Sequence, residues 1–123
     1  MVTRHERVRK RANKLITRWG QVAILRSGYG DEGDRRITVV EDAFSTKEID
    51  GRVVLQGDRR YLVSALSPDD GTPIAVPNQD TEHLVVTDPD DDSIVTDLRI
   101  VSPPGRLSPG PTVIYYELHC RDR

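Results

Sequence analysis

The sequence predicts a mainly β protein, a small barrel or sandwich of six to seven short antiparallel strands with one N-terminal amphipathic α-helix. Two observations lead to this prediction. Apolar residues recur at spacings of three and four before Gly20, and from Gln21 onward they gather in short β-rich runs separated by Gly, Pro and Asp. A length of 123 residues suits a single domain. Residues 1–20 would form the helix and residues 21–123 the β-barrel body.

The N-terminal segment is predicted to be a helix from Arg4 to Trp19, about 24 Å long. Thr3 and Glu6 match a capping box at its start, and Gly20 provides a stop after its end. We expect the helix to lean across a sheet with Trp19 as its largest anchor, because its apolar residues form one continuous stripe. The stripe consists of Val8, Ala12, Leu15, Ile16 and Trp19.

After Gly20 the apolar pattern changes to that of strands. The first strand is predicted at Gln21–Arg26 and the second at Arg36–Val40, with the Gly/Asp-rich loop Ser27–Asp34 between them. The most distinctive segment is IDGRVVLQGDRRYLVSAL at Ile49–Leu66. Its two β-rich runs flank a short polar turn that contains Gly57, which predicts a hairpin.

The rest of the chain alternates between connections and strands. Pro68–Gln79 is a Pro/Asp/Gly-rich connection that is longer than usual. The further segments are strand Glu82–Thr87, turn Asp88–Ser93, strand Ile94–Val101, break Ser102–Gly110 and strand Pro111–Cys120. Prolines 103, 104, 109 and 111 make the break either a stiff docking segment or a loop that cannot pair as a strand.

Charge is segregated along the chain. Residues 1–20 hold seven basic residues and one acidic residue, whereas residues 21–123 hold eleven basic and nineteen acidic residues. The protein is therefore a basic helix on an acidic body, although its net charge is only −2. With such asymmetry, the basic helix is attracted to negatively charged surfaces, whereas the acidic body repels polyanions.

Several classes of protein are disfavoured. A lone cysteine excludes an internal disulfide, and Cys120 is predicted to be a small buried residue that points away from its neighbour His119. Apolar runs are too short to cross a membrane, and the charged N-terminus does not resemble a signal peptide, so a soluble protein is expected. Because His5 and His83 lack metal-ligand spacing and no nucleotide or nucleophile motif occurs, we expect no metal, no cofactor and no enzyme activity.

Two motifs carry a resemblance to a known family. One is the hairpin pattern IDG-x-V-x-x-x-GDRR-x-x-V-S-A at Ile49–Ala65, and the other is the terminal VIYYELHCR at Val113–Arg121. Together with the basic helix and the Gly/Asp loop, they resemble the small neck proteins of long-tailed bacteriophages, called head-closure, stopper or head-tail joining proteins. The resemblance implies a small barrel with a helix beside it, made in the host cytoplasm and assembled as a homo-oligomeric ring in the virion neck. Its neighbours would be portal or portal-adaptor proteins on one side and tail terminator or tail tube proteins on the other, with packaged DNA passing through the ring.

The expected function is therefore structural: closing the DNA-filled head and presenting a docking ring to the tail, away from any membrane. The hairpin at Ile49–Ala65 would be central, and the loops Ser27–Asp34 and Pro68–Gln79 would contact neighbouring rings or remain mobile surface segments. Candidate partner-binding residues are Arg4, Arg7, Arg11, Lys14, Arg18, Tyr29, Asp31, Asp69 and Asp70.

The acidic turn has three interpretations. Its carboxylates would line a lumen that does not grip DNA, remain a solvated turn, or hold calcium, for which the EF-hand pattern would need Gly and Glu where Ser93 and Arg99 stand. The residues concerned are Asp88, Asp90, Asp91 and Asp92.

The basic helix and the function leave alternatives open. The helix cations would hold an acidic partner or neighbouring subunit, touch the phosphates of DNA, or form an ordinary solvated face. The alternative functions are a tail-terminator or tail-end ring protein of the same neck, and a small nucleic-acid-binding β-barrel in which the helix supplies the electrostatic footprint.

Overall fold

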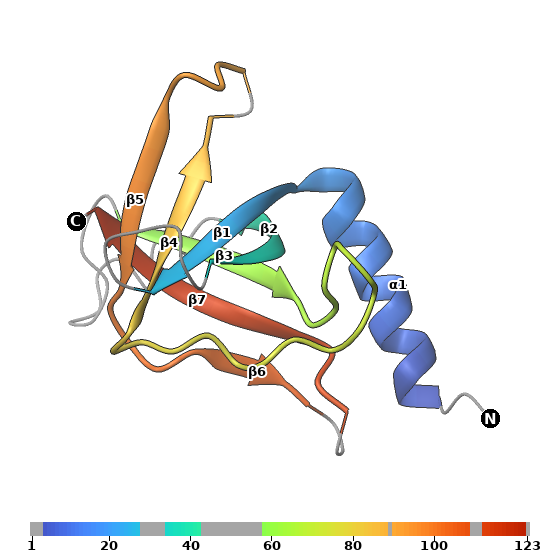
Figure 1. The fold of residues 1–123 in the computed structure, drawn as a ribbon. Coiled ribbons are helices and arrows are strands. Elements are labelled where there is room, and N and C mark those ends of the chain that lie inside the picture. Colours follow the sequence, from blue (N-terminus) through green and yellow to red (C-terminus); the bar gives the residue numbers. More distant parts are fainter. Residues whose placement is uncertain (1–3, 28–33, 43–57, 89, 109–111, 123) are drawn as a thin grey trace.

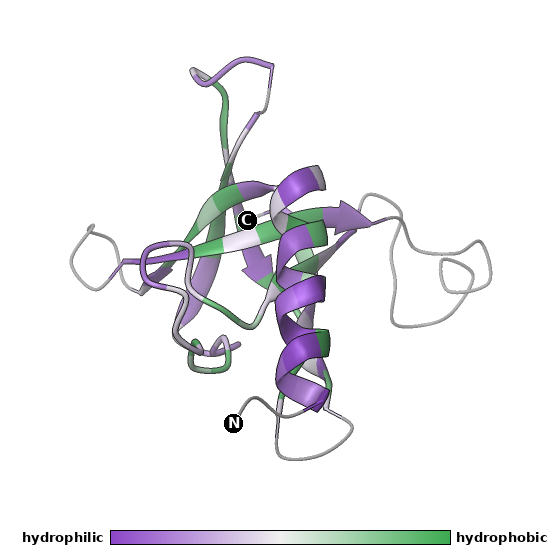
Figure 2. Ribbon diagram, turned by 90° about the vertical axis from the view of Figure 1, so that its right-hand side faces the viewer, coloured by the Kyte–Doolittle hydropathy of each residue, from purple (hydrophilic) through white to green (hydrophobic). Residues whose placement is uncertain are grey.

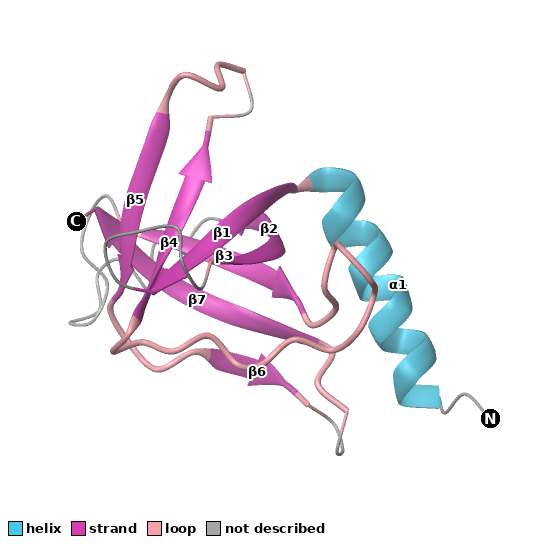
Figure 3. Cartoon of the chain, in the orientation of Figure 1, coloured by secondary structure: helices cyan, strands magenta, loops and turns pink. Residues whose placement is uncertain are grey.

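The computed structural model describes residues 4–27, 34–42, 58–88, 90–108 and 112–122. These residues contain one helix and seven strands (Figure 1; Figure 3). The elements are α1 (Arg4–Trp19), β1 (Gln21–Ser27), β2 (Arg35–Asp42), β3 (Arg59–Ser64), β4 (Glu82–Thr87), β5 (Val95–Ile100), β6 (Gly105–Leu107) and β7 (Tyr115–Asp122). The predicted class, mainly β with one N-terminal helix, is confirmed.

The strands form a closed barrel. Among the described residues, six antiparallel strands follow one another in the order β3-β2-β1-β4-β5-β7, and β7 pairs back onto β3 from Arg59↔Cys120 to Ser64↔Tyr115. The other edge of β7 is divided between two partners: residues 120–122 pair with β5 and residues 115–117 pair with β6. The body is thus a barrel with β6 as an additional strand on its outside.

The core fills the barrel because side chains alternate along every strand. Along β7, for example, Tyr116, Leu118 and Cys120 point inward while His119 faces outward. Cys120 is fully buried, which confirms its prediction as a small core residue. The core consists of Ala23, Leu25, Ile37, Val39, Tyr61, Val63, Ala65, Leu84, Val86, Leu98, Ile100, Tyr116, Leu118 and Cys120.

Most predicted strands form within two residues of their expected ends, with two corrections. The break predicted at 102–110 contains β6, and the last strand begins at Tyr115 instead of Pro111 and continues to Asp122. The hairpin pairing predicted for the second run, now β3, is wrong, because β2 occupies one edge of β3 and β7 occupies the other. Residues 43–57, with the first strand and the first half of the turn of that hairpin, lie outside the described residues, as does Thr3. Of the second half of the predicted turn, Arg59 belongs to β3.

A buried ion pair holds the seam where β3 meets β7. The side chain of Asp58, just before β3, is 1% exposed. Its carboxylate accepts hydrogen bonds from Arg121 at 2.8 Å (Nε) and 2.9 Å (Nη2), and it lies 2.5 Å from Nε2 of His119. The bidentate contact raises the pKa of Arg121. Asp58 therefore fastens the start of β3 to the outward face of β7.

The long connection between β3 and β4 is folded back on itself. The Ser67 amide donates to the Thr72 carbonyl at 2.8 Å, and Gly71 adopts a φ of 72°, which a glycine accommodates without strain. Arg35 secures the connection from β2, because its guanidinium donates to the Ala75 carbonyl and to both carboxylate oxygens of Glu82. These contacts hold the connection against the barrel surface.

Candidate interaction site

The helix α1 lies against the outside of the barrel, mainly over β2 and β3 (Figure 1). Ile16 is the one residue of α1 that is buried, and Asn13 accepts a hydrogen bond from the Ser64 hydroxyl of β3. At the end of the helix, the Gly20 amide donates to the Ile16 carbonyl at 2.8 Å, which confirms the predicted stop. A Cβ at Gly20 would lie 1.9 Å from the Val39 carbonyl oxygen, so only glycine fits between the helix and β2.

Most of the apolar stripe is exposed. The exposed fraction is 70% for Trp19, 59% for Leu15 and 40% for Val8, so the prediction that Trp19 anchors the helix to the sheet is wrong. Successive helical residues are rotated by about 100°, which places these three on average about 80° away from Ile16. The helix therefore contacts the barrel through the Ile16 edge of its apolar stripe, and Val8, Leu15 and Trp19 remain exposed.

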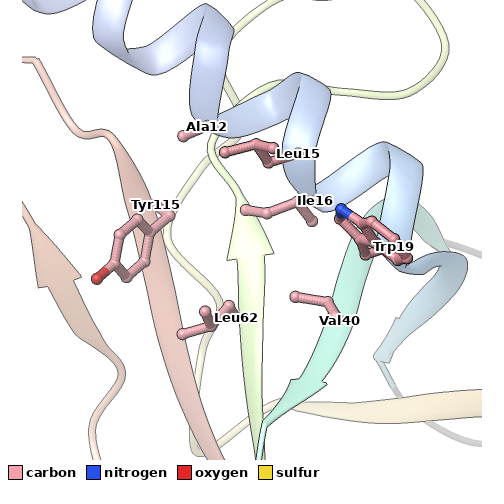
Figure 4. Close-up of a pocket in the computed structure, with 7 residues that line it drawn as sticks. All are labelled: Ala12, Leu15, Ile16, Trp19, Val40, Leu62 and Tyr115. Atoms are coloured by element: carbon pink, nitrogen blue, oxygen red, sulfur yellow. The ribbon is translucent and has the colours of Figure 1, made fainter.

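An apolar groove of about 300 Å³ runs between this stripe and the barrel (Figure 4). Its floor consists of outward-facing side chains on three strands: Val40 of β2, Leu62 of β3 and Tyr115 of β7. A second hollow of about 220 Å³ shares Trp19 and Val40 with the first. The full lining of the groove is Ala12, Leu15, Ile16, Trp19, Val40, Leu62 and Tyr115.

The predicted cations lie beside the exposed stripe. Around the helix axis, the mean direction of the cations is about 80° from that of the exposed apolar residues Val8, Leu15 and Trp19. The cations therefore lie on the side of α1 away from the barrel. The Arg18 guanidinium lies 5.3 Å from the centre of the Trp19 ring, a cation–π distance. Hydrophilic and hydrophobic residues consequently alternate along the visible side of α1 in Figure 2. The five cations, Arg4, Arg7, Arg11, Lys14 and Arg18, are all exposed.

The acidic turn forms the tip of the β4–β5 hairpin, which extends away from the barrel in Figure 1. Asp88 accepts hydrogen bonds from the backbone amides of Asp90 and Asp91, and Asp91 accepts from the hydroxyl and amide of Ser93. The two bonds from Ser93 lower the pKa of Asp91. Asp88 and Asp91 thus shape the turn, while Asp90 and Asp92 are exposed.

Two apolar residues directly follow the acidic turn. Ile94 is 51% exposed and Val95 is 57% exposed. The Ile94 carbonyl accepts from the Asp88 amide at 2.9 Å, which closes the turn and holds both residues at the tip. The hairpin tip therefore combines negative charge with exposed apolar surface.

The remaining predicted site residues are separate from the groove. Asp69 forms an ion pair with Arg36, and Asp70 accepts hydrogen bonds from the amide and hydroxyl of Thr72, which lower the pKa of Asp70. Both belong to the folded β3–β4 connection. Tyr29 and Asp31 lie outside the described residues.

Sequence reasoning missed the floor of the groove, although a signal was present. Leu62 stands between the inward-facing Tyr61 and Val63, so strand alternation assigns it to the outer surface. An apolar residue at such an outward position indicates that something covers it or docks on it. Tyr115, next to the inward-facing Tyr116, gives the same signal on β7.

Within the described ranges, no three His, Cys, Asp or Glu side chains are placed to hold a metal ion. The same part of the chain has no helix whose length and apolar character would carry it through a membrane. Comparisons with protein-family models, curated proteins and solved structures gave no match.

Proposed function

We propose that this chain is a structural subunit of the neck of a long-tailed bacteriophage, closing the filled head and providing a docking ring for the tail. The sequence motifs described above suggest this role. The observation that carries it furthest is the exposed apolar groove beside α1, with a row of cations next to it. Exposed apolar surface with a charged margin is typical of surfaces that bind other proteins.

The distribution of charge fits a subunit that assembles. The basic face of α1 would attract an acidic surface and set the orientation of the partner, while the apolar groove would supply most of the binding energy. Because the body is acidic overall, another copy of this chain or an acidic portal-side protein is a suitable partner. Residues of the β3–β4 connection, including Asp69, would contact an adjacent ring.

Electron microscopy of particles made without this protein tests the proposal. Heads that have packaged DNA should leak it and should carry no tails. Tails of irregular length would instead assign the chain to tail termination, and normal virions would contradict a neck role. Supplying the variant Leu15→Ser/Trp19→Ser should fail to restore tailed particles, whereas Val22→Ser, which alters an exposed apolar residue of β1 outside the groove, should restore them.

A second candidate function is nucleic-acid binding by the same helix, favoured by the row of five exposed cations described above. Contact with about five phosphates would make log K fall with log salt at a slope of about −4.5. Fluorescence anisotropy with labelled duplex DNA over a salt series measures this slope. Affinity that is absent at low salt would remove this candidate and leave the neck proposal intact.

A further inference from the structure

We infer that the groove beside α1 receives the tip of the β4–β5 hairpin from a second copy of this chain. The inference deepens the proposed function, on which it rests for the closure of a ring. It identifies the partner of the groove as the protein itself and names the two surfaces that meet. The residues named below for the two surfaces all belong to the described part of the chain.

The two surfaces are complementary in charge and in apolar character. The hairpin tip presents the exposed carboxylates of Asp90 and Asp92 and, after Ser93, the exposed side chains of Ile94 and Val95. The groove presents apolar side chains along one margin of α1, and the cations of α1 lie beside that margin, outside the groove lining. Ile94 and Val95 would enter the groove while the carboxylates face the cations.

A symmetric contact between two helices is disfavoured by the same charges. Packing the stripe of one α1 onto the stripe of another would bring two rows of cations together, which costs free energy unless anions intervene. The hairpin tip is the oppositely charged partner that the chain itself provides.

The contact must join different copies. In Figures 1 and 2 the hairpin tip points away from the barrel and from α1, so one molecule does not bring its own tip to its own groove. Each copy then offers one tip and one groove, which is a heterologous contact. Such contacts produce a ring when the rotation between copies closes and a filament when it does not. The acidic turn would lie at the boundary between subunits rather than in the lumen.

Two variants separate the surfaces. Asp90→Lys/Asp92→Lys reverses the charge of the tip without removing Asp88 or Asp91, whose carboxylates hold the turn. Leu15→Ser/Trp19→Ser removes the apolar margin of the groove at positions that are mostly exposed. The matched control Asp80→Lys/Asp122→Lys makes the same change in net charge at two exposed residues outside the hairpin tip.

Sedimentation velocity over a range of protein and salt concentrations measures the association. The wild type and the control variant should self-associate, more weakly as salt increases because the charges are screened. Each of the two surface variants should lose roughly tenfold or more of that affinity. A mixture of the two variants should form a 1:1 heterodimer that grows no further, because one intact tip meets one intact groove. Adding Arg11→Glu/Lys14→Glu to the tip variant should restore association.

Four results decide the matter. A wild type that stays monomeric at low salt up to its solubility limit overturns the inference, as does a variant mixture that does not pair. A tip variant that assembles as well as the wild type also overturns it. Pairing of the mixture while the wild type forms open filaments supports the contact but contradicts the ring required by the proposed function. Particle morphology without the protein tests that function separately, so the two failures can be told apart.

Discussion

Replacing Ile16 and Trp19 separately by alanine tests how α1 is attached to the barrel. Ile16 is 6% exposed and Trp19 is 70% exposed, although both belong to the same apolar stripe. Ile16→Ala should destabilise the protein, whereas Trp19→Ala should leave its stability nearly unchanged. The larger side chain is expected to contribute less because its ring extends into the surroundings instead of the interface.

The magnitudes follow from burial. Truncating a buried isoleucine to alanine costs about 2–5 kcal/mol, and the lower part of this range applies because Ile16 borders an open groove that can partly collapse. Trp19→Ala loses partial contacts and the cation–π contact with Arg18, worth about 0.5–1 kcal/mol at an exposed site. It gains a few tenths of a kcal/mol in helix propensity. The net change for Trp19→Ala should therefore be within about 1 kcal/mol.

Urea denaturation followed by far-UV circular dichroism measures both variants at one salt concentration. With a slope of about 1–3 kcal/mol per molar urea, a loss of about 2 kcal/mol should lower the unfolding midpoint of Ile16→Ala by about 0.7–2 M. Trp19→Ala should shift it by a few tenths molar. If Trp19→Ala lowered the midpoint as much as Ile16→Ala does, the ring would be buried against the barrel and the exposed groove would not exist.

Three further predictions concern the barrel. Burial raises the pKa of Cys120 to about 12, so a thiol reagent at pH 8 should label the protein only after it unfolds; rapid labelling with native circular dichroism would contradict a closed barrel. Gly20→Ala should cost about 1–3 kcal/mol by urea titration, because its Cβ would overlap the Val39 carbonyl, and an unchanged midpoint would refute the close approach. Asp58→Asn should lower the midpoint of thermal unfolding, because it weakens the contacts between β3 and β7. The matched surface change Asp80→Asn should leave that midpoint unchanged. Equal midpoints for the two variants would show that the buried carboxylate is dispensable.

The sequence predicted best those features that depend on neighbours along the chain. Strand β4 was predicted with its observed bounds because its apolar run is bordered by polar turn residues on both sides. The bounds of α1 were also correct, since Gly20 ends the helix directly after Trp19. Local pattern and turn chemistry suffice for such elements.

The rotation of α1 about its own axis could not be predicted in this way. A helical stripe predicts which residues prefer burial, but contacts with distant residues decide which of them meet the barrel. Here Asn13 bonds to Ser64 and Gly20 fits against Val39, and these two contacts turn Trp19 outward. The groove was missed for the same reason.

Strand β6 and the closure of the barrel also depend on distant partners. β6 is three residues long and all three are exposed, so it has no apolar alternation to reveal it. It forms because β5 leaves residues 115–117 of β7 unpaired on that edge. Closure through β3 and β7 joins segments far apart in the chain, which is why the sequence left barrel and sandwich open.

Fluorescence of Trp19 tests most directly whether the groove is an assembly surface, because it is the one tryptophan in the sequence. In the dilute monomer its exposed ring should emit at long wavelength. As protein concentration rises and copies associate, the emission maximum should move to shorter wavelength, and Asp90→Lys/Asp92→Lys should abolish the shift. Emission that stays unchanged while sedimentation shows assembly would mean that copies join through another surface.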